Sequence, residues 1–511
     1  MRRTKTLVFA SRFIVVFLSI VAQAVALMLL FYVLGQKYAW VQIVSTIMGV
    51  ILFLYIVNKD QPAVYKLPWV ILILIAPLVG IVVYYTFGNV KLSKKQMKNF
   101  RRIYDEHHDD YYRQQDVLSK MQSQGIKGLG TVKYIRSATS LPVYDSSKTT
   151  YLKSGEEFFN SLCDEILKAN EYVFLEYFIV EKGKMFTGIL DALENVMQKG
   201  VKVYFMYDDV GSITKVRRRF FKELCALGIN ARRFGKFVPI VSVIHNNRDH
   251  RKIAVIDGKV GFMSGANIAD EYINETKPFG RWRDNAIKIE GQATDSLVRL
   301  FIQLYNMAGG KPLDETDFIC TSHNEFSDGY VLPFGDSPYP IDTDHVAENV
   351  YLDIISRAEK YLYIVTPYLI VDTNVTEALK IAVKRGVDVR IIVPEIPDKK
   401  AVYLLTKSTC KNLFDAGVKV YAFRGGFIHS KTVLADGKIA IVGTANFDFR
   451  SLVHHFECAT LLCENSSIND IYEDFNQLFN YECAKCTAQD LKIGGLNRLL
   501  KSVLSLFAPL M

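Results

Sequence analysis

Cysteine is scarce in this chain: there are eight cysteines among 511 residues, scattered along the sequence. So few cysteines in so long a chain exclude a small fold held together by disulfides, and they suit a soluble part in a reducing cytoplasm. Cys483 and Cys486 form a CxxC motif without a second pair, which supports a zinc or redox role only weakly. The run from His107 to Asp110 also contains metal-ligand residue types, but its highly charged surroundings favour a solvated helical linker.

Long hydrophobic runs are confined to the first ninety residues. They extend from Phe13 to Leu34, from Tyr38 to Val57 and from Leu67 to Phe87, and each has about the twenty residues that a helix needs to cross a bilayer. A cleaved signal peptide is disfavoured, because the first run is long and a second follows almost at once. The sequence therefore predicts a membrane anchor over residues 1–90.

Basic residues flank this anchor on both sides, and positive flanks tend to stay in the cytoplasm. We therefore expect two full spans, with one of the three runs, left open which, re-entrant or interfacial, and the remainder of the chain in the cytoplasm. Pro77 and Gly80 interrupt the third run. The formal net charge of +9 indicates an anionic partner, either nucleic acid or an acidic membrane, and the anchor favours the membrane. The flanking residues are Arg2, Arg3, Lys5 and Arg12 before the runs and Lys91, Lys94, Lys95, Lys98, Arg101 and Arg102 after them.

From about residue 131, short apolar runs alternate with amphipathic ones, which is the pattern of an α/β fold. A strand over 171–180, a helix over 185–200 and a strand over 201–207 are expected, and the same order recurs over 360–371, 374–386 and 387–393. A duplication explains this recurrence. We expect a polar connector over 91–130, a first domain over 131–310, a second domain with its entry linker over 311–485, and an amphipathic tail over 486–511.

One eight-residue pattern occurs in both copies, as HRKIAVID at 250–257 and as HSKTVLAD at 429–436. On a strand, a histidine and a lysine two positions apart point from the same face. Asp257 and Asp436 are each followed by glycine, so they serve either a hairpin turn or an ion pair that orients a neighbouring group. Each histidine is followed by an asparagine 17 residues later, Asn267 or Asn446, and this matched spacing makes a chance repeat improbable.

Two histidines, two lysines and two asparagines around one pocket describe a site for a phosphodiester, whose oxygens are charged and accept hydrogen bonds. One imidazole can attack phosphorus and form a covalent phosphohistidine, while the other protonates the leaving alcohol and later deprotonates the incoming one. These residues predict phosphodiester cleavage or transfer, and they leave open whether water or another alcohol is the acceptor.

Both motifs resemble the HxKx4D signature of the phospholipase D superfamily. With the hydrophobic N-terminal runs and the phrases RWRDNAIKIEG at 281–291 and GTANFDFRS at 443–451, the chain is similar to the bacterial cardiolipin synthase family within it. The resemblance implies two α/β sandwich domains related by pseudo-twofold symmetry, with one active site at their interface. It also implies phosphatidyl transfer between two phosphatidylglycerol molecules to give cardiolipin and glycerol, without metal or cofactor, in the bacterial cell membrane.

Residue by residue, the resemblance makes one motif histidine the nucleophile and the other the general acid/base, with His250 expected to be the nucleophile and the order left open. It makes Glu457, and by a looser match in spacing Asp284, the acidic residues that orient the histidines. The phosphate oxygens would be bound by Lys252, Asn267, Lys431 and Asn446. The catalytic signature itself comprises His250, Lys252, Asp257, His429, Lys431 and Asp436. Ser264 and Thr444 are expected only to serve the loops.

Two further segments suggest contact with a membrane. The basic stretch at 215–228 is either a solvated helix face or a surface that gathers anionic phosphatidylglycerol. The leucine-rich segment at 494–511 is either an interfacial helix or an ordinary helix docked on the catalytic body. The rival functions are a membrane-bound phosphodiesterase hydrolase, another phosphatidyltransferase and an inactive scaffold. A nuclease is disfavoured, because the aromatic residues lie mostly in apolar runs.

Overall fold

The computed structural model describes residues 37–59, 63–85, 115–236, 247–320, 322–323, 326–338, 341 and 344–508, together with Leu29 and Val33. The chain divides into two compact units, whose described parts are residues 37–85 and 115–508. The run from His107 to Asp110 and most of the first hydrophobic run lie outside the described residues.

The N-terminal unit consists of apolar helices. Helix α2 (Ala39–Val57) has 19 residues and is the helix, within the described part of the chain, that is long and apolar enough to cross a membrane. Helices α3 (Ala63–Ile75) and α4 (Pro77–Val83) are separated at Ala76, because proline disfavours helical geometry in the residue before it. The predicted break in the third hydrophobic run is thus confirmed. The number of spans and their orientation stay predictions.

The three helices pack closely against one another. A side-chain carbon on Gly80 would lie 2.7 Å from the Cα of Ile73, so glycine is needed where α3 and α4 meet. A small apolar cluster joins the three helices, and it contains Leu52, Ile56, Ile73, Ile81 and Tyr84.

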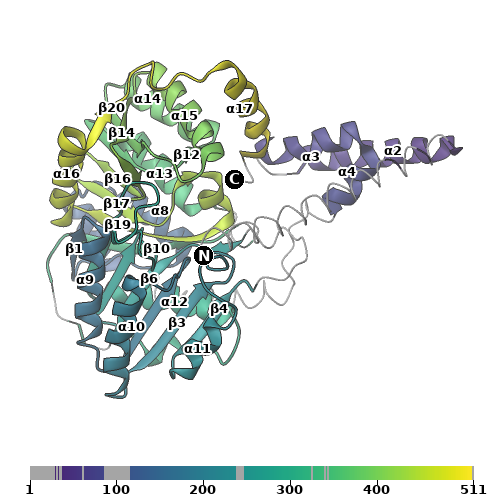
Figure 1. Ribbon diagram of the computed structural model, residues 1–511. Coiled ribbons are helices and arrows are strands. Elements are labelled where there is room, and N and C mark those ends of the chain that lie inside the picture. Colours follow the sequence, from purple (N-terminus) through teal and green to yellow (C-terminus); the bar gives the residue numbers. More distant parts are fainter. Residues whose placement is uncertain are drawn as a thin grey trace. The chain divides into compact units, whose positions relative to one another are not determined.

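The larger unit contains two sheets (Figure 1), and the strands of the two sheets run in the same order. The first sheet has seven strands in the order β1-β9-β7-β6-β2-β3-β4, and the second follows the matching order β10-β19-β17-β16-β11-β13-β14. In each sheet the last three strands of this order are parallel to one another and the remaining neighbours are antiparallel. The predicted α/β fold with two copies of one unit is therefore confirmed.

The strands of the first sheet are β1 (Ser147–Leu152), β2 (Tyr172–Tyr177), β3 (Lys202–Asp208), β4 (Asn230–Phe234), β6 (Lys252–Ile256), β7 (Val260–Ser264) and β9 (Ala286–Gly291). Those of the second are β10 (Tyr330–Asp336), β11 (Tyr361–Val365), β13 (Asp388–Pro394), β14 (Lys419–Phe423), β16 (Thr432–Ala435), β17 (Ile439–Gly443) and β19 (His455–Cys463), with β20 (Cys483–Lys485) beside β14. Short strands are β5 (Arg248–Asp249), β8 (Arg281–Arg283), β12 (Leu369–Ile370), β15 (Gly426–Ile428) and β18 (Phe447–Asp448).

Helices connect the strands in both domains, and their ends follow local sequence signals. Helix α9 begins after Ser154, whose hydroxyl accepts a hydrogen bond from the backbone N–H of Glu157 at 3.1 Å. The expected helices that stop at Gly200 and Gly386 are present, and both glycines have positive φ, as a helix end often requires. The helices are α9 (Gly155–Ile166), α10 (Lys184–Met197), α11 (Phe220–Ala226) and α12 (Thr294–Met307) in the first domain, and α13 (Val346–Arg357), α14 (Thr373–Lys384), α15 (Lys400–Asp415) and α16 (Ser467–Gln477) in the second. Helix α17 (Gly495–Phe507) lies near the C-terminus, and short helical turns occur at η3 (Glu315–Asp317), η4 (Arg450–His454) and η5 (Leu478–Glu482).

The predicted domain boundaries stay predictions, and the structure shows two helices at their N-terminal side. Residues 115–130 were expected to be part of a connector, yet helix α7 (Gln115–Ser123) lies there and α8 (Leu129–Thr139) follows. Helix α8 packs on α13 and β10 of the second domain, and its Thr131 hydroxyl donates to Asp353 at 2.5 Å. Val132 and Ile135 are fully buried. These residues therefore complete the second domain although they precede the first in sequence.

Candidate active site

Two short parallel strand pairs connect the domains beside the motif histidines. Strand β5, directly before His250, pairs with the start of β19 from the second domain. Strand β15, directly before His429, pairs with β8 from the first domain. The backbone N–H of His250 donates to the carbonyl of Phe456 at 2.9 Å, and that of His429 donates to the carbonyl of Arg283 at 2.7 Å. Each histidine is thus held by a strand of the other domain.

The residue after each of these carbonyls is a buried carboxylate that faces the histidine. The Nδ1 atom of His250 lies 2.8 and 3.0 Å from the two carboxylate oxygens of Glu457. The Nδ1 atom of His429 lies 2.7 Å from an oxygen of Asp284. The two acidic residues expected to orient the histidines are therefore in contact with them, each across the domain boundary. An Nδ1–H donated to a carboxylate leaves the lone pair of an uncharged imidazole on Nε2.

Thr444 contacts one of these carboxylates, although the sequence predicted only a role in its loop. Its hydroxyl donates to Glu457 and accepts a hydrogen bond from the backbone N–H of Cys458 at 3.0 Å. The matching position in the first domain is Gly265, and a side chain there would collide with Asp284. Ser264 only donates to the carbonyl of Ala266, at 2.9 Å, so the prediction that it serves its loop fits its contact.

Lys252 and Lys431 are both buried, and each Nζ donates to the backbone carbonyl of its own motif histidine. Burial lowers the pKa of Lys252 to about 8, although the charge of Glu457 opposes the shift. Burial lowers the pKa of Lys431 to about 7, against the charge of Asp284. Their protonated forms lack the stabilisation that water would supply. An anionic phosphodiester between them would restore it.

Both motif histidines are uncharged at neutral pH. Burial, followed by the charges of Lys252 and Lys431, lowers the pKa of His250 well below its ordinary value. Burial and the charge of Lys431 lower the pKa of His429 to about 4, while Asp284 opposes the shift. Burial by itself would raise the pKa of Asp284, but the charges of Lys431 and His429 hold it below its usual value. An uncharged imidazole with a free Nε2 lone pair is the form that a nucleophile requires.

The two asparagines lie beside this group, and part of each amide is occupied. Asn267 accepts from the backbone N–H of Ile179 at 2.9 Å and donates to the Tyr272 hydroxyl at 2.6 Å. Asn446 donates to the Ser451 hydroxyl at 3.0 Å. An amide nitrogen carries two N–H groups. Among the described residues, one N–H on each asparagine is therefore without a partner and is left for a ligand.

Asp257 and Asp436 lie at the far ends of β6 and β16 from the lysines. Their carboxylates accept hydrogen bonds at 2.7 to 2.9 Å from three successive backbone N–H groups, those of residues 170–172 for Asp257 and 359–361 for Asp436. Both aspartates have positive φ, as a tight hairpin demands. Five residues of strand cover about 16 Å, so these contacts favour the hairpin turn among the two alternatives for Asp257 and Asp436, and their catalytic role stays a prediction. They form the turns and bind the neighbouring strand.

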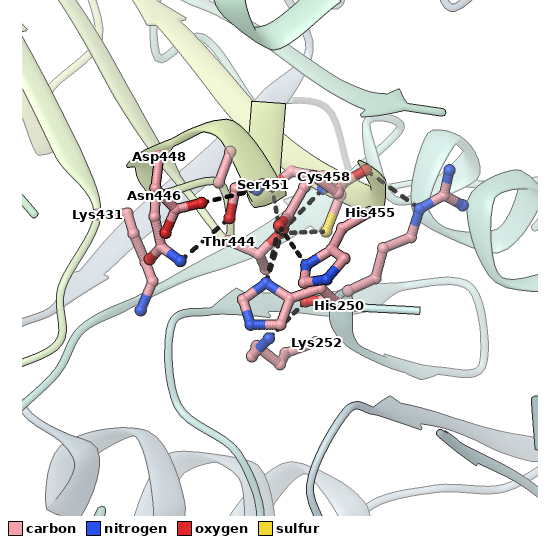
Figure 2. A network of polar contacts seen from close by, with 12 residues as sticks. His250, Lys252, Lys431, Thr444, Asn446, Asp448, Ser451, His455 and Cys458 are labelled. Atoms are coloured by element: carbon pink, nitrogen blue, oxygen red, sulfur yellow. Dashed lines mark hydrogen bonds and ion pairs between the residues drawn. The ribbon is translucent and has the colours of Figure 1, made fainter. Parts of the chain in front are cut away.

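His455 is a residue of the site that sequence reasoning missed. Its ring lies beside that of His250, with centroids 5.2 Å apart (Figure 2). Its side chain is 8% exposed, and neither ring nitrogen has a hydrogen-bond partner among the described residues. Nδ1 is 3.6 Å from an oxygen of Glu457. The only available signal was its place two residues before Glu457.

A metal ion could be held by His250, His455 and Glu457, whose ligand atoms all lie within 4.8 Å of one another. The Nδ1 atom of His250 is already hydrogen-bonded to Glu457. The positive charges of Lys252 and Lys431 act on the same ring. This environment favours an anion over a cation.

A pair of buried acids behind His250 was also missed. Glu176 on β2 and Asp249 on β5 are fully buried, and neither oxygen of Glu176 has a hydrogen-bond partner among the described residues. Burial and the charge of Asp249 raise the pKa of Glu176 well above its ordinary value, and burial raises that of Asp249 to about 7. A glutamate inside the apolar strand pattern at 171–180 was the available signal.

Basic side chains of the stretch at 215–228 form ion pairs within the protein. Lys215 is half-buried and bridges Glu181 at 2.6 Å and Glu271 at 3.0 Å. Arg219 pairs with Glu223 one helical turn later, at 2.8 Å. These contacts favour the interpretation as a helix face. All eight cysteines are free thiols, Cys483 and Cys486 included.

Comparisons with known proteins agree with this geometry. A family described as "Cardiolipin synthase, PLD-like domain" matches residues 162–299 and 351–480, one segment in each domain. A second, described as "Phospholipase_D-nuclease N-terminal", matches residues 47–89. The protein is therefore of the phospholipase D class, with two catalytic-type domains in one chain.

Curated relatives narrow this class. The chain is 32% identical to cardiolipin synthase 2 of Bacillus anthracis, over 84% of this chain and 82% of that protein, and 31% identical to a cardiolipin synthase of Geobacillus, over 90% and 91%. An uncharacterized protein of Streptococcus mutans is 38% identical over 90% of this chain and 99% of that one. The chain belongs to the cardiolipin synthase family.

Among solved structures, the phosphatidylserine synthase of Haemophilus influenzae superposes with a TM-score of 0.57 at 17% sequence identity. It covers 74% of this chain and 97% of that one. A likeness at this identity supports the fold of the catalytic unit, and it carries no information on the substrate.

Proposed function

We propose that the protein transfers a phosphatidyl group from one phosphatidylglycerol to another, giving cardiolipin and glycerol, by two displacements through a covalent phosphohistidine. Membership of the cardiolipin synthase family supports the overall reaction. The observation that carries the mechanism is the pair of buried histidines, each bonded at Nδ1 to a carboxylate of the other domain.

In the first displacement, Nε2 of His250 attacks phosphorus and the bond from phosphorus to the glycerol oxygen breaks. His429 gives its proton to that oxygen, and glycerol leaves. The leading charges around His250 all lower its pKa, whereas Asp284 supports a proton on His429. This difference is why we assign the nucleophile to His250 and the acid to His429. His429 is uncharged before the substrate binds. The negative phosphodiester, once bound, raises the pKa of His429, so that this histidine takes up from solvent the proton that it gives to glycerol.

In the second displacement, His429 accepts the proton of the free hydroxyl of a second phosphatidylglycerol. That oxygen attacks phosphorus, the bond from phosphorus to His250 breaks, and cardiolipin forms. Both histidines return to their starting states, so the proton and charge balance closes. Water in place of the lipid alcohol would give phosphatidic acid instead.

Lys252 and Lys431, with the remaining N–H groups of Asn267 and Asn446, would bind the non-bridging oxygens as charge develops on them. Cations buried with lowered pKa gain most from such an anion, because it replaces the hydration they have lost. Glu457 and Asp284 would hold the imidazoles in the correct tautomer and orientation.

A pseudo-twofold relation between the domains would produce this single shared site. The repeated strand order and the reciprocal strand pairs β5 with β19 and β15 with β8 support it. For the location, we infer a bacterial cell membrane crossed more than once, with the catalytic unit in the cytoplasm. Helix α2 and the family match over residues 47–89 support the membrane part of that inference.

The test is the product formed by the purified full chain in mixed micelles that contain phosphatidylglycerol, with a chelator present. Cardiolipin and glycerol in equal amounts are expected. Phosphatidic acid as the only product would identify a hydrolase. Transfer to an added alcohol such as serine, without cardiolipin, would identify another phosphatidyltransferase, and a complete lack of turnover would leave a scaffold.

A further inference from the structure

Helix α17, Gly495–Phe507, carries an apolar face that is turned to solvent. With 3.6 residues per turn, Leu496, Leu499, Leu500, Val503 and Leu506 fall on one side of this helix. Their exposed fractions are 82%, 66%, 47%, 48% and 39%. A helix that belongs to a globular core buries such a face.

The contact between α17 and the rest of the catalytic unit is made by a different side of the helix. Helix α17 packs against α15. The half-buried positions are Lys501, Leu504 and Ser505, which lie along one flank and not at the centre of the apolar face. The helix is therefore docked by its flank and presents its apolar face outwards. This arrangement does not fit an ordinary docked helix.

The concentration of apolar side chains is specific to this helix. In the described part of the chain from residue 115 to 508, ten large hydrophobic side chains are exposed, and half of them lie on α17. The others are single positions, namely Leu167, Leu227, Ile381, Ile396 and Tyr481. Single exposed apolar residues are ordinary, whereas a contiguous patch marks a surface that is covered by a partner.

The charge of this segment indicates what covers it. From Leu491 to the last residue the sequence has no acidic side chain, while Lys492, Arg498 and Lys501 are basic. Arg498 is exposed, and it forms no ion pair with the described residues. An apolar face on a helix with basic and no acidic residues is complementary to an anionic lipid surface.

We propose that α17 lies in the headgroup region of an anionic bilayer, with Leu496, Leu499, Leu500, Val503 and Leu506 in contact with acyl chains. The helix then holds the catalytic unit on the membrane from the C-terminal end of the chain, in addition to the N-terminal helices. A two-tailed lipid can reach a site held in this way without leaving the bilayer. The inference rests on the proposed function only in naming phosphatidylglycerol as the anionic lipid.

The direct test uses the full chain reconstituted in phosphatidylglycerol vesicles, with the photoreactive residue p-benzoylphenylalanine in place of Leu499. The matched control carries it in place of Asn497, which is also exposed and points about 160° away around the helix. At least fivefold more cross-linking to lipid is expected at position 499 than at 497. Equal yields, or cross-links from 499 to protein instead of lipid, would show that the face is covered by protein and would overturn the proposal.

The preference of α17 for an anionic surface is tested by a change of lipid. When phosphatidylcholine replaces phosphatidylglycerol in the vesicles, the lipid cross-link at position 499 should fall at least twofold. The same yield in both lipids would refute recognition of an anionic surface. Neither measurement depends on turnover, so both remain decisive if the protein makes no cardiolipin.

A kinetic readout separates membrane docking from a structural defect. The double variant Leu499→Ser with Val503→Ser should raise the phosphatidylglycerol mole fraction needed for half-maximal rate at least threefold, with the maximal rate unchanged. The control Asn497→Ser with Ser502→Ala should leave both unchanged. A wild-type dependence on lipid in the Leu499→Ser and Val503→Ser variant would contradict the proposal, and so would a loss confined to the maximal rate.

Discussion

The two domains share one strand order, but they surround their histidines with different side chains. On the side of His250, ionisable residues occupy buried positions, namely Glu176, Arg248, Asp249, Arg251 and His455. At the matching positions beside His429 the chain has Val365, Phe427, Ile428, Ser430 and Trp282. The backbone arrangement has been kept in both domains, while the lining of the site has diverged.

This difference bears on how protons are held near each histidine. Buried charges are costly unless they are paired or neutralised. Arg248 is paired with Asp208 at 2.9 Å, but Glu176 and Asp249 are adjacent acids with raised pKa values, so the pair retains a proton near neutral pH. The ring of His429 instead packs among aromatic side chains, including Trp282 at 5.4 Å between centroids. Apart from the lysine and the carboxylate that both histidines have, one domain surrounds its histidine with titratable groups and the other with aromatic side chains.

Removal of either histidine tests whether the two rings have the opposite roles proposed for them. His250→Ala and His429→Ala should each lower kcat by at least about 10⁴-fold, because both displacements need both imidazoles. With a phosphatidyl ester whose leaving group needs no proton, His429→Ala should still accumulate a covalent adduct on His250, detected by mass spectrometry of the intact protein. His250→Ala should show none. An adduct on His429 would reverse the assignment.

Neutral replacements of the two carboxylates test whether the cross-domain pairs work alike. Glu457→Gln and Asp284→Asn should each lower kcat by about 10²- to 10⁴-fold, because the imidazole loses the acceptor that sets its tautomer. The thermal midpoint should change little, and steady-state rates with phosphatidylglycerol measure the effect. If only one of the two variants is impaired, the pairs are not equivalent. The histidine whose carboxylate was replaced without loss of activity is then oriented by another group.

The acid pair is tested by replacing Glu176 with valine, the residue found at the matching position of the second domain. In Glu176→Val, Asp249 loses the adjacent carboxyl group of Glu176, whose retained proton lowers the pKa of Asp249, so this pKa rises further and Asp249 is neutral at pH 7. The Asp249 charge that raises the pKa of Lys252 is then lost, and the pKa of Lys252 falls below about 8. The alkaline limb of kcat/KM should move to lower pH, by about one unit or less.

Glu176→Gln is the matched control for this shift, since glutamine keeps a hydrogen-bond donor beside Asp249. A smaller displacement of the alkaline limb is expected for it. An alkaline limb that stays in place in Glu176→Val would mean that the charged lining of the first domain does not act on Lys252.

The smallest effect on activity is expected at the aspartates of the hairpins, where the two domains are alike. Asp257→Ala and Asp436→Ala should change kcat less than about twofold, because each carboxylate is bonded to backbone N–H groups away from the site. Each variant should be destabilised by about 1–3 kcal/mol, as buried donors lose their acceptor. Denaturant unfolding of the catalytic unit measures this. A large loss of kcat without a change in stability would support a catalytic role.

Several features of the protein followed from local sequence pattern. Hydrophobic period, glycine helix stops and the Asp-Gly turns predicted the strands and helices of both domains, since each depends on residues only a few positions apart. The doubled motif with its matched asparagine predicted that both histidines act in one reaction. The break at Pro77 was readable for the same reason, because proline acts on its own backbone and on that of its neighbour.

Only the tertiary structure decided which groups meet. The partners Glu457 of His250 and Asp284 of His429 are 207 and 145 residues away in sequence, and no local spacing specifies such a contact. Helix α8 joins the second domain, and Glu176 is sealed against Asp249, because burial depends on how whole elements pack. Whether Asp257 and Asp436 reach the site was likewise undecided by their motif. The length of a strand carries the carboxylates away from the histidines, which favours the hairpin turn.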